Sequence, residues 1–68
     1  MDNGTSARER VEKELKDLSE KIRKLEDFLK NISLCDKISE TQRILLVCQL
    51  DLMKAYGRVL DMRLKLWS

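Results

Sequence analysis

The side chains most able to do chemistry in this sequence are lysines and arginines, which bind anions. Charge-assisted hydrogen bonds from such side chains to phosphate are stronger than neutral ones, and a symmetric oligomer presents each cation more than once. This arrangement suits a small ligand that carries two phosphates. The cations form one group of Arg8, Arg10, Lys13, Lys21, Arg23 and Lys24, and a second group of Arg43, Lys54, Arg58 and Arg63.

Catalysis has no obvious place in the sequence. There is no His, so neither a Ser-His-Asp nor a Cys-His arrangement can form, and there is no glycine-rich phosphate loop. Cys35 and Cys48 lack the CxxC spacing of a metal site and a base that would activate a thiolate. We therefore expect a protein that is not an enzyme and has no metal or other cofactor.

The charge pattern argues against several classes of partner. Charged residues make up 38% of the chain with both signs interspersed, and a net charge of +2 is too small to indicate DNA binding. Most charges are expected on a solvated face, with pairs such as Glu9–Lys13 and Asp17–Lys21 at i,i+4 spacing. No apolar run approaches the roughly 20 residues that span a bilayer, and residues 1–5 lack the features of a secretory signal. The sequence therefore predicts a cytoplasmic protein that binds neither DNA nor membranes.

The first half of the chain predicts one helix over residues 7–30. No proline interrupts it, and Ser6 with Glu9 forms a capping box that would start the helix at Ala7, after a disordered tail of residues 1–5. Apolar residues then alternate at spacings of four and three, as in a coiled-coil seam. The seam consists of Val11, Leu15, Leu18, Ile22, Leu25, Leu29 and Ile32.

A second helix is predicted over residues 40–66. Asn, Ser and Asp residues interrupt the seam after Lys30, and the run Ser39-Glu40-Thr41-Gln42 offers a second capping box. Because the connection, residues 31–39, is short, the two helices are expected to pack as antiparallel neighbours. The sequence therefore predicts an all-α fold, a single helical hairpin domain over residues 1–68.

The predicted second helix carries two apolar stripes on nearly opposite sides, which one partner helix cannot cover. One stripe is expected to meet the first helix and the other to meet another protomer. Gly57, in the first stripe, would let a neighbouring backbone approach closely. The first stripe is Leu46, Leu50, Met53, Gly57, Leu60, Leu64 and Trp67. The second contains Cys48 and Ala55 beside the expected oligomer interface of Leu45, Leu52, Val59, Met62 and Leu66.

The size of the chain also favours an oligomer. A domain of this length buries only about 60% of the surface that its unfolded chain exposes, and small domains without a disulfide or a metal are commonly stabilised by partner subunits. We expect a compact homo-oligomeric helical bundle, with dimer, tetramer and hexamer left open. A coiled-coil module that binds other proteins, without a small ligand, would show the same stripes and is the alternative function.

Two segments together resemble a known family. The segment from Arg10 to Leu29 fits the pattern RVxxExxxLxxKIxxLxxFL, and the segment from Leu46 to Arg63 fits LxxQxxxMxxYxxxLxxR. In combination they resemble the Acb/Tad hairpin domain of phage anti-CBASS and anti-Thoeris proteins, over roughly residues 10–64. Members of that family form helical homo-oligomers, hexamers in the known cases, and sequester cyclic nucleotide immune signals without cleaving them.

The resemblance implies an immune-evasion sponge in the host cell cytoplasm, if a phage encodes the chain. Its ligand would be a cyclic di- or trinucleotide or a cyclic ADP-ribose-like signal. Lys21 matches the lysine that meets the ligand phosphate, and Arg10 and Arg63 are further candidates. Ser6 and Ala7 stand where the family has a stacking aromatic. Tyr56, expected in the core, and Trp67 are the aromatics left for stacking.

Overall fold

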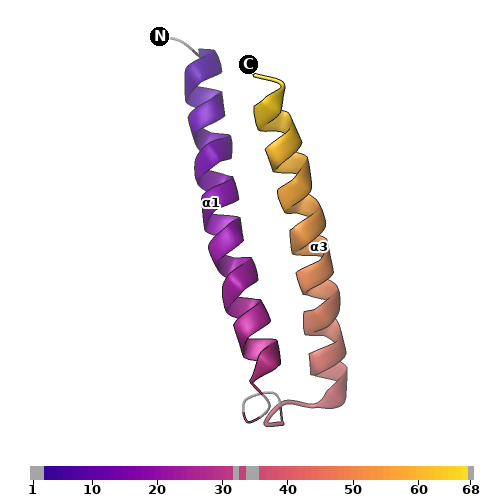
Figure 1. Ribbon diagram of the computed structural model, residues 1–68. Helices are drawn as coiled ribbons and strands as arrows, with labels where there is room; N and C mark the ends of the chain where they lie inside the picture. Colours follow the sequence, from indigo (N-terminus) through magenta and orange to yellow (C-terminus); the bar gives the residue numbers. More distant parts are fainter. Residues whose placement is uncertain (1–2, 32, 34–35, 68) are drawn as a thin grey trace.

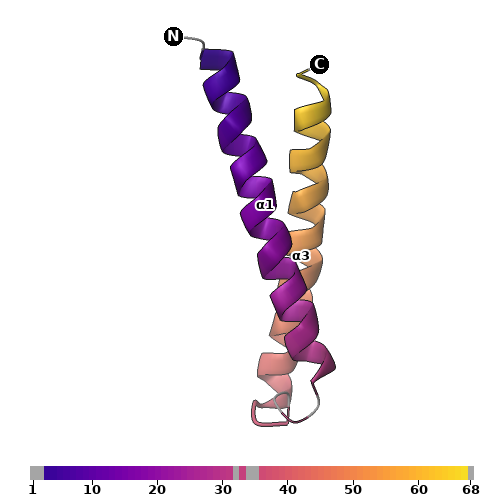
Figure 2. The same ribbon diagram turned by 60° about the vertical axis from the view of Figure 1, so that its left-hand side comes forward.

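The protein is a hairpin of two long helices. The computed structural model describes residues 3–31, 33 and 36–67, with side chains from residue 7 onward. Helix α1 (Asn3–Lys30) and helix α3 (Glu40–Lys65) lie side by side and antiparallel (Figure 1), and the turned view shows that their axes are inclined to each other (Figure 2). The molecule measures 50 × 15 × 14 Å. The predicted all-helical hairpin is confirmed.

Helix α1 begins earlier than predicted. It starts at Asn3, so Ser6 lies inside the helix and residues 3–5 are not part of a disordered tail; residues 1–2 lie outside the described part of the chain. The segment before Ser6 contains no proline, so nothing blocks further backbone hydrogen bonds along the helix. A capping box marks a helix start only where the preceding chain leaves the helical conformation.

Helix α3 begins as predicted. The Ser39 side chain accepts a hydrogen bond from the backbone N–H of Gln42 at 3.1 Å, and its extended backbone (φ −67°, ψ 158°) makes it the N-cap. The helix ends at Lys65, one residue before the predicted end: the N–H of Leu66 is shared between the carbonyls of Met62 and Arg63, and the N–H of Trp67 donates to the carbonyl of Leu64, three residues back, in a tightened last turn. Cys35, in the connection, lies outside the described residues.

The core is a narrow seam between the two helices. Among the described residues four hydrophobic side chains are buried, and Leu60 is completely so. The heptad seam of α1 therefore packs against the first stripe of α3, which leaves the second stripe of α3 uncovered. The core cluster consists of Val11, Leu18 and Leu60, with Leu15, Ile22, Met53, Leu64 and Trp67 packed around it.

Gly57 faces side chains of α1 rather than its backbone. A methyl group at this position would meet Leu18 Cδ2 at 3.7 Å and Ile22 Cδ1 at 3.9 Å, which are ordinary contacts. The close backbone approach expected from the sequence is therefore absent within the hairpin, because the bulky seam residues hold the helices apart.

Replacing Gly57 by alanine is expected to stabilise the protein. Alanine is better than glycine in a helix interior by about 1 kcal/mol, which for a domain of this size raises Tm by about 4–8 °C. Thermal unfolding followed by circular dichroism measures the change. A lower Tm together with a smaller oligomer would show instead that Gly57 contacts a second copy of the chain.

Within the described residues, neither helix is long and apolar enough to cross a membrane.

Candidate anion-binding site

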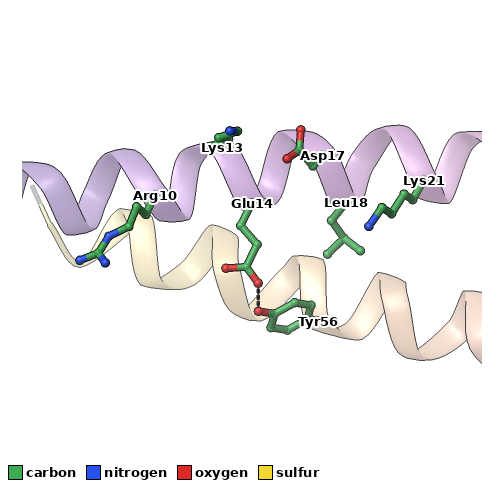
Figure 3. A pocket seen from close by; sticks show the side chains of 7 residues that line it. All are labelled: Arg10, Lys13, Glu14, Asp17, Leu18, Lys21 and Tyr56. Carbon is green, nitrogen blue, oxygen red and sulfur yellow. Dashed lines mark hydrogen bonds between the residues drawn. The ribbon is translucent and has the colours of Figure 1, made fainter.

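An open groove of about 330 Å³ follows one edge of the helix pair (Figure 3). Two residues predicted to bind ligand, Arg10 and Lys21, both line it, and Tyr56 forms its α3 side. Glu14 and Leu18 point across the groove toward α3 in this view. The full lining is Arg10, Lys13, Glu14, Asp17, Leu18, Lys21 and Tyr56.

The heptad pattern explains why these charges share one edge. Arg10, Glu14, Asp17 and Lys21 each directly precede a residue of the α1 seam. They therefore lie about 100° around the helix from the buried stripe and form a row. The row places a cation at each end and two carboxylates between them, and about 16 Å of helix axis separates Arg10 from Lys21, from the rise of 1.5 Å per residue.

No carboxylate of the described residues forms an ion pair with the groove cations. Arg8 pairs with Glu12 at 3.0 Å and Arg23 with Asp27 at 3.7 Å, both within α1. In the part of the chain that the structure describes, Arg10, Lys13 and Lys21 make no such ion pair, so the expected Glu9–Lys13 and Asp17–Lys21 pairs are not formed. The alternation of charges allows either set of i,i+4 pairs, and exposed pairs of this kind differ little in energy.

Tyr56 connects the two helices at the groove. Its hydroxyl donates a hydrogen bond to Glu14 Oε2 (Figure 3), and its side chain is 44% exposed. The expectation that Tyr56 lies in the core is wrong, because the residue sits at the edge of the packed stripe, where its hydroxyl reaches a carboxylate. Sequence reasoning also missed Glu14 as a site residue, since pairing across the hairpin depends on a register that the sequence pattern leaves open.

The link to Glu14 changes the acidity of the tyrosine. The hydrogen bond to Glu14 raises the pKa of the Tyr56 hydroxyl, and desolvation and the negative charge of Glu14 add to this effect. Arg63 acts in the opposite direction as a smaller influence. A raised pKa in the folded state means that the link stabilises the fold below the pKa of unfolded tyrosine and is lost as pH rises through the folded value.

Because the chain contains a single tyrosine, its ionisation can be followed directly and tests the link between Tyr56 and Glu14. In a titration followed by phenolate absorbance, Tyr56 is expected to ionise above the ordinary tyrosine pKa of about 10. Glu14→Gln should lower the midpoint, because it removes the carboxylate, and Tyr56→Phe should abolish the transition. An ordinary midpoint in the wild type would contradict the link.

A second link lies on the opposite edge of the pair. Lys54 Nζ lies 2.9 Å from Glu26 Oε2 and joins the two helices there. The hydrogen bond from Lys54, together with its positive charge, lowers the pKa of the Glu26 carboxyl. Lys54 is therefore already engaged by a carboxylate, whereas the groove cations form no ion pair with the residues that the structure describes.

The remaining predicted ligand residues lie outside the groove. Arg63 lines a separate hollow of about 290 Å³ with Leu66 and Trp67. It stands seven residues after Tyr56, two turns along the same edge of α3. Ala7 is half-buried on α1, and the Ser6 side chain lies outside the described part of the structure. A single hairpin thus brings together Arg10 and Lys21 but not Arg63.

The second stripe of α3 is exposed and adjoins the groove. Leu52 and Val59 lie four residues before and three residues after Tyr56, so they are its neighbours on the helix surface. Cys48, on the same stripe, is an exposed free thiol. The predicted interface residues have exposed fractions of 58% for Leu45, 72% for Leu52, 52% for Val59, 66% for Met62 and 85% for Leu66.

These features define a class of protein: a helical hairpin with an open cationic groove at one edge and an uncovered apolar stripe beside it. The comparison with protein families is more specific. A family model described as Sequestin matches residues 5–66, and the chain belongs to the Sequestin family. No curated protein and no solved structure matches the chain.

Proposed function

We propose that this protein is a sponge that binds and sequesters a small anionic nucleotide signal without cleaving it. The observation that carries the proposal is the groove in which Arg10 and Lys21 make no ion pair with any described residue and lie beside the exposed Tyr56. The family name, Sequestin, denotes sequestration and supports the same function.

The proposed ligand is a cyclic nucleotide: a cyclic di- or trinucleotide, or a cyclic ADP-ribose-like signal. Arg10 and Lys21 supply charge-assisted hydrogen bonds to its phosphates. The Tyr56 ring offers a stacking surface for a base, which substitutes for the aromatic missing at Ser6 and Ala7. The resemblance to the Acb/Tad hairpin domain of phage sponges supports this ligand class and a role in evading host immunity.

We further propose that the functional form is a homo-oligomer, a hexamer if the resemblance to the Acb/Tad domain extends to assembly. Four buried hydrophobic side chains in the described residues are a small core for an independent domain, and the exposed stripe of α3 is as apolar as the covered one. Because the stripe adjoins Tyr56, a second copy packed there would also close the open side of the groove and add its own cations.

The exposed stripe also favours the alternative function, a coiled-coil module that binds another protein. Such a module needs the apolar stripe but does not need the free cations of the groove. The sponge function therefore requires Arg10 and Lys21, and the interaction module does not.

The test is a capture experiment. Purified protein is incubated with cyclic di-AMP, cyclic di-GMP, a cyclic trinucleotide and cyclic ADP-ribose isomers, separated from unbound nucleotide, and then heated to release what it holds. We expect at least one nucleotide to be captured and released unchanged, as chromatography would show. Release of a cleaved product would indicate an enzyme, and no capture by a folded oligomer would favour the interaction module.

A further inference from the structure

Glu14 occupies an unusual position for a residue in an anion-binding groove. It stands in the row between Arg10 and Lys21 and points across the groove toward α3 (Figure 3). A carboxylate repels phosphate, so its presence weakens the binding of any ligand that places a phosphate beside it. The phosphates of a bound nucleotide are therefore directed to the cations, and a different part of the ligand faces Glu14.

The hydrogen bond from Tyr56 determines which carboxylate oxygen of Glu14 remains available to a ligand. It occupies Oε2, which leaves Oε1 with its acceptor capacity on an exposed side chain. An ionised carboxylate only accepts hydrogen bonds, so the group that meets Oε1 must be a donor. Because the tyrosine already holds the side chain in the groove, little further conformational entropy is lost when the donor arrives.

From these two observations, and resting on the proposed function, we infer that Glu14, positioned by Tyr56, accepts a hydrogen bond from a neutral donor of the bound nucleotide. The donor is a ribose hydroxyl or a base N–H. Glu14 thereby determines which nucleotide is held, while Arg10 and Lys21 bind its phosphates. A site that uses a carboxylate to accept from a ligand discriminates strongly against analogues that lack the donor.

The direction in which one substitution changes the binding affinity separates this role of Glu14 from a merely structural one. Glu14→Gln keeps an oxygen that can accept from Tyr56 and removes a negative charge. If Glu14 only repels or only supports the fold, an anionic ligand should bind the variant as well as, or more tightly than, the wild type. If Glu14 accepts from the ligand, the variant should bind roughly 10- to 100-fold more weakly, the loss expected for one charged hydrogen bond.

Calorimetry with cyclic di-AMP, cyclic di-GMP and cyclic ADP-ribose tests the inference, with Asp17→Asn as the matched control. Asp17→Asn removes the same charge from the same row but has no tyrosine partner, so it should bind as tightly as the wild type or more tightly. Circular dichroism and light scattering check that both variants keep helical content and oligomeric size. Tyr56→Phe, which keeps the ring but frees Glu14, should give a smaller loss than Glu14→Gln.

The 2′-deoxy counterpart of each binding probe identifies the donor. A Glu14→Gln effect that vanishes with the deoxy compound assigns the donor to the ribose. An effect that persists assigns it to the base for 3′,5′-linked cyclic dinucleotides, which have no other free hydroxyl; for cyclic ADP-ribose, whose 3′-hydroxyls are also free, the 3′-deoxy compounds are compared as well. Unchanged or tighter binding by Glu14→Gln, or an equal loss in Asp17→Asn, would overturn the inference while leaving the sponge function intact. Absence of binding by the wild type to every probe would overturn the proposed function itself.

Discussion

Replacing Leu52 by aspartate is expected to dissociate the proposed homo-oligomer and unfold most of the protein. In a single hairpin the Leu52 side chain is 72% exposed, and a substitution at such a surface position changes stability by about 0.5 kcal/mol or less. In an assembly that covers the second stripe of α3, the same change buries an unpaired charge, which costs several kcal/mol. The two states of assembly therefore predict opposite outcomes.

Light scattering and circular dichroism at micromolar concentration measure the result. Val59→Asp, on the same stripe, should behave in the same way. Lys16→Asp places the same side chain at an exposed position of α1, in a hollow lined by α1 residues alone, and should leave the oligomer intact. A wild-type protein that scatters as a single 8 kDa species, or a Leu52→Asp variant that keeps its size and Tm, would contradict the oligomer.

Replacing Lys21 by alanine is expected to weaken nucleotide binding without changing the fold. Lys21 is exposed, lines the groove and makes no ion pair in the described structure. On the proposed function, its loss removes a contact to the ligand and none that holds the hairpin. Each charged hydrogen bond lost should cost about 1.5 to 3 kcal/mol, and more where two copies of the lysine meet one ligand. Calorimetry with the nucleotide that the wild type captures measures this difference.

Lys30→Ala is the matched control, since Lys30 ends α1 near the connection and lies outside the groove. It should bind as the wild type does. Arg10→Ala should weaken nucleotide binding as Lys21→Ala does, because the two cations stand at the two ends of the same row. Equal binding by the Lys21→Ala variant and the wild type would show that the groove is not the nucleotide-binding site.

The helices were predictable because their signals are local. The alternation of apolar residues in α1 and the Ser39 cap of α3 depend only on neighbours in sequence, and the structure places both as predicted. The start of α1 was not predictable in this way. No proline before Ser6 forces the backbone out of the helix, so a capping pattern alone does not fix where the helix starts.

Part of the site was also predictable from local sequence signals. Arg10 and Lys21 lie on one helix, so their spacing alone places them on one edge. The Tyr56–Glu14 hydrogen bond joins residues that are far apart in the sequence and depends on how the helices slide past each other. That register is set by the packing of whole seams, including the fit of Leu60 into the α1 surface, which residue types do not reveal one at a time.

In the proposed oligomer, the position of Tyr56 between the groove and the exposed stripe would couple nucleotide binding to protomer association. A nucleotide held beside Tyr56 in an assembly would contact a surface that exists only when the protomers are together, so binding and association must favour each other by equal free energies. Nucleotide capture would then be cooperative, and the apparent affinity for the nucleotide would rise with the protein concentration. Below the concentration at which protomers associate, the same groove, open on one side, would release its ligand readily.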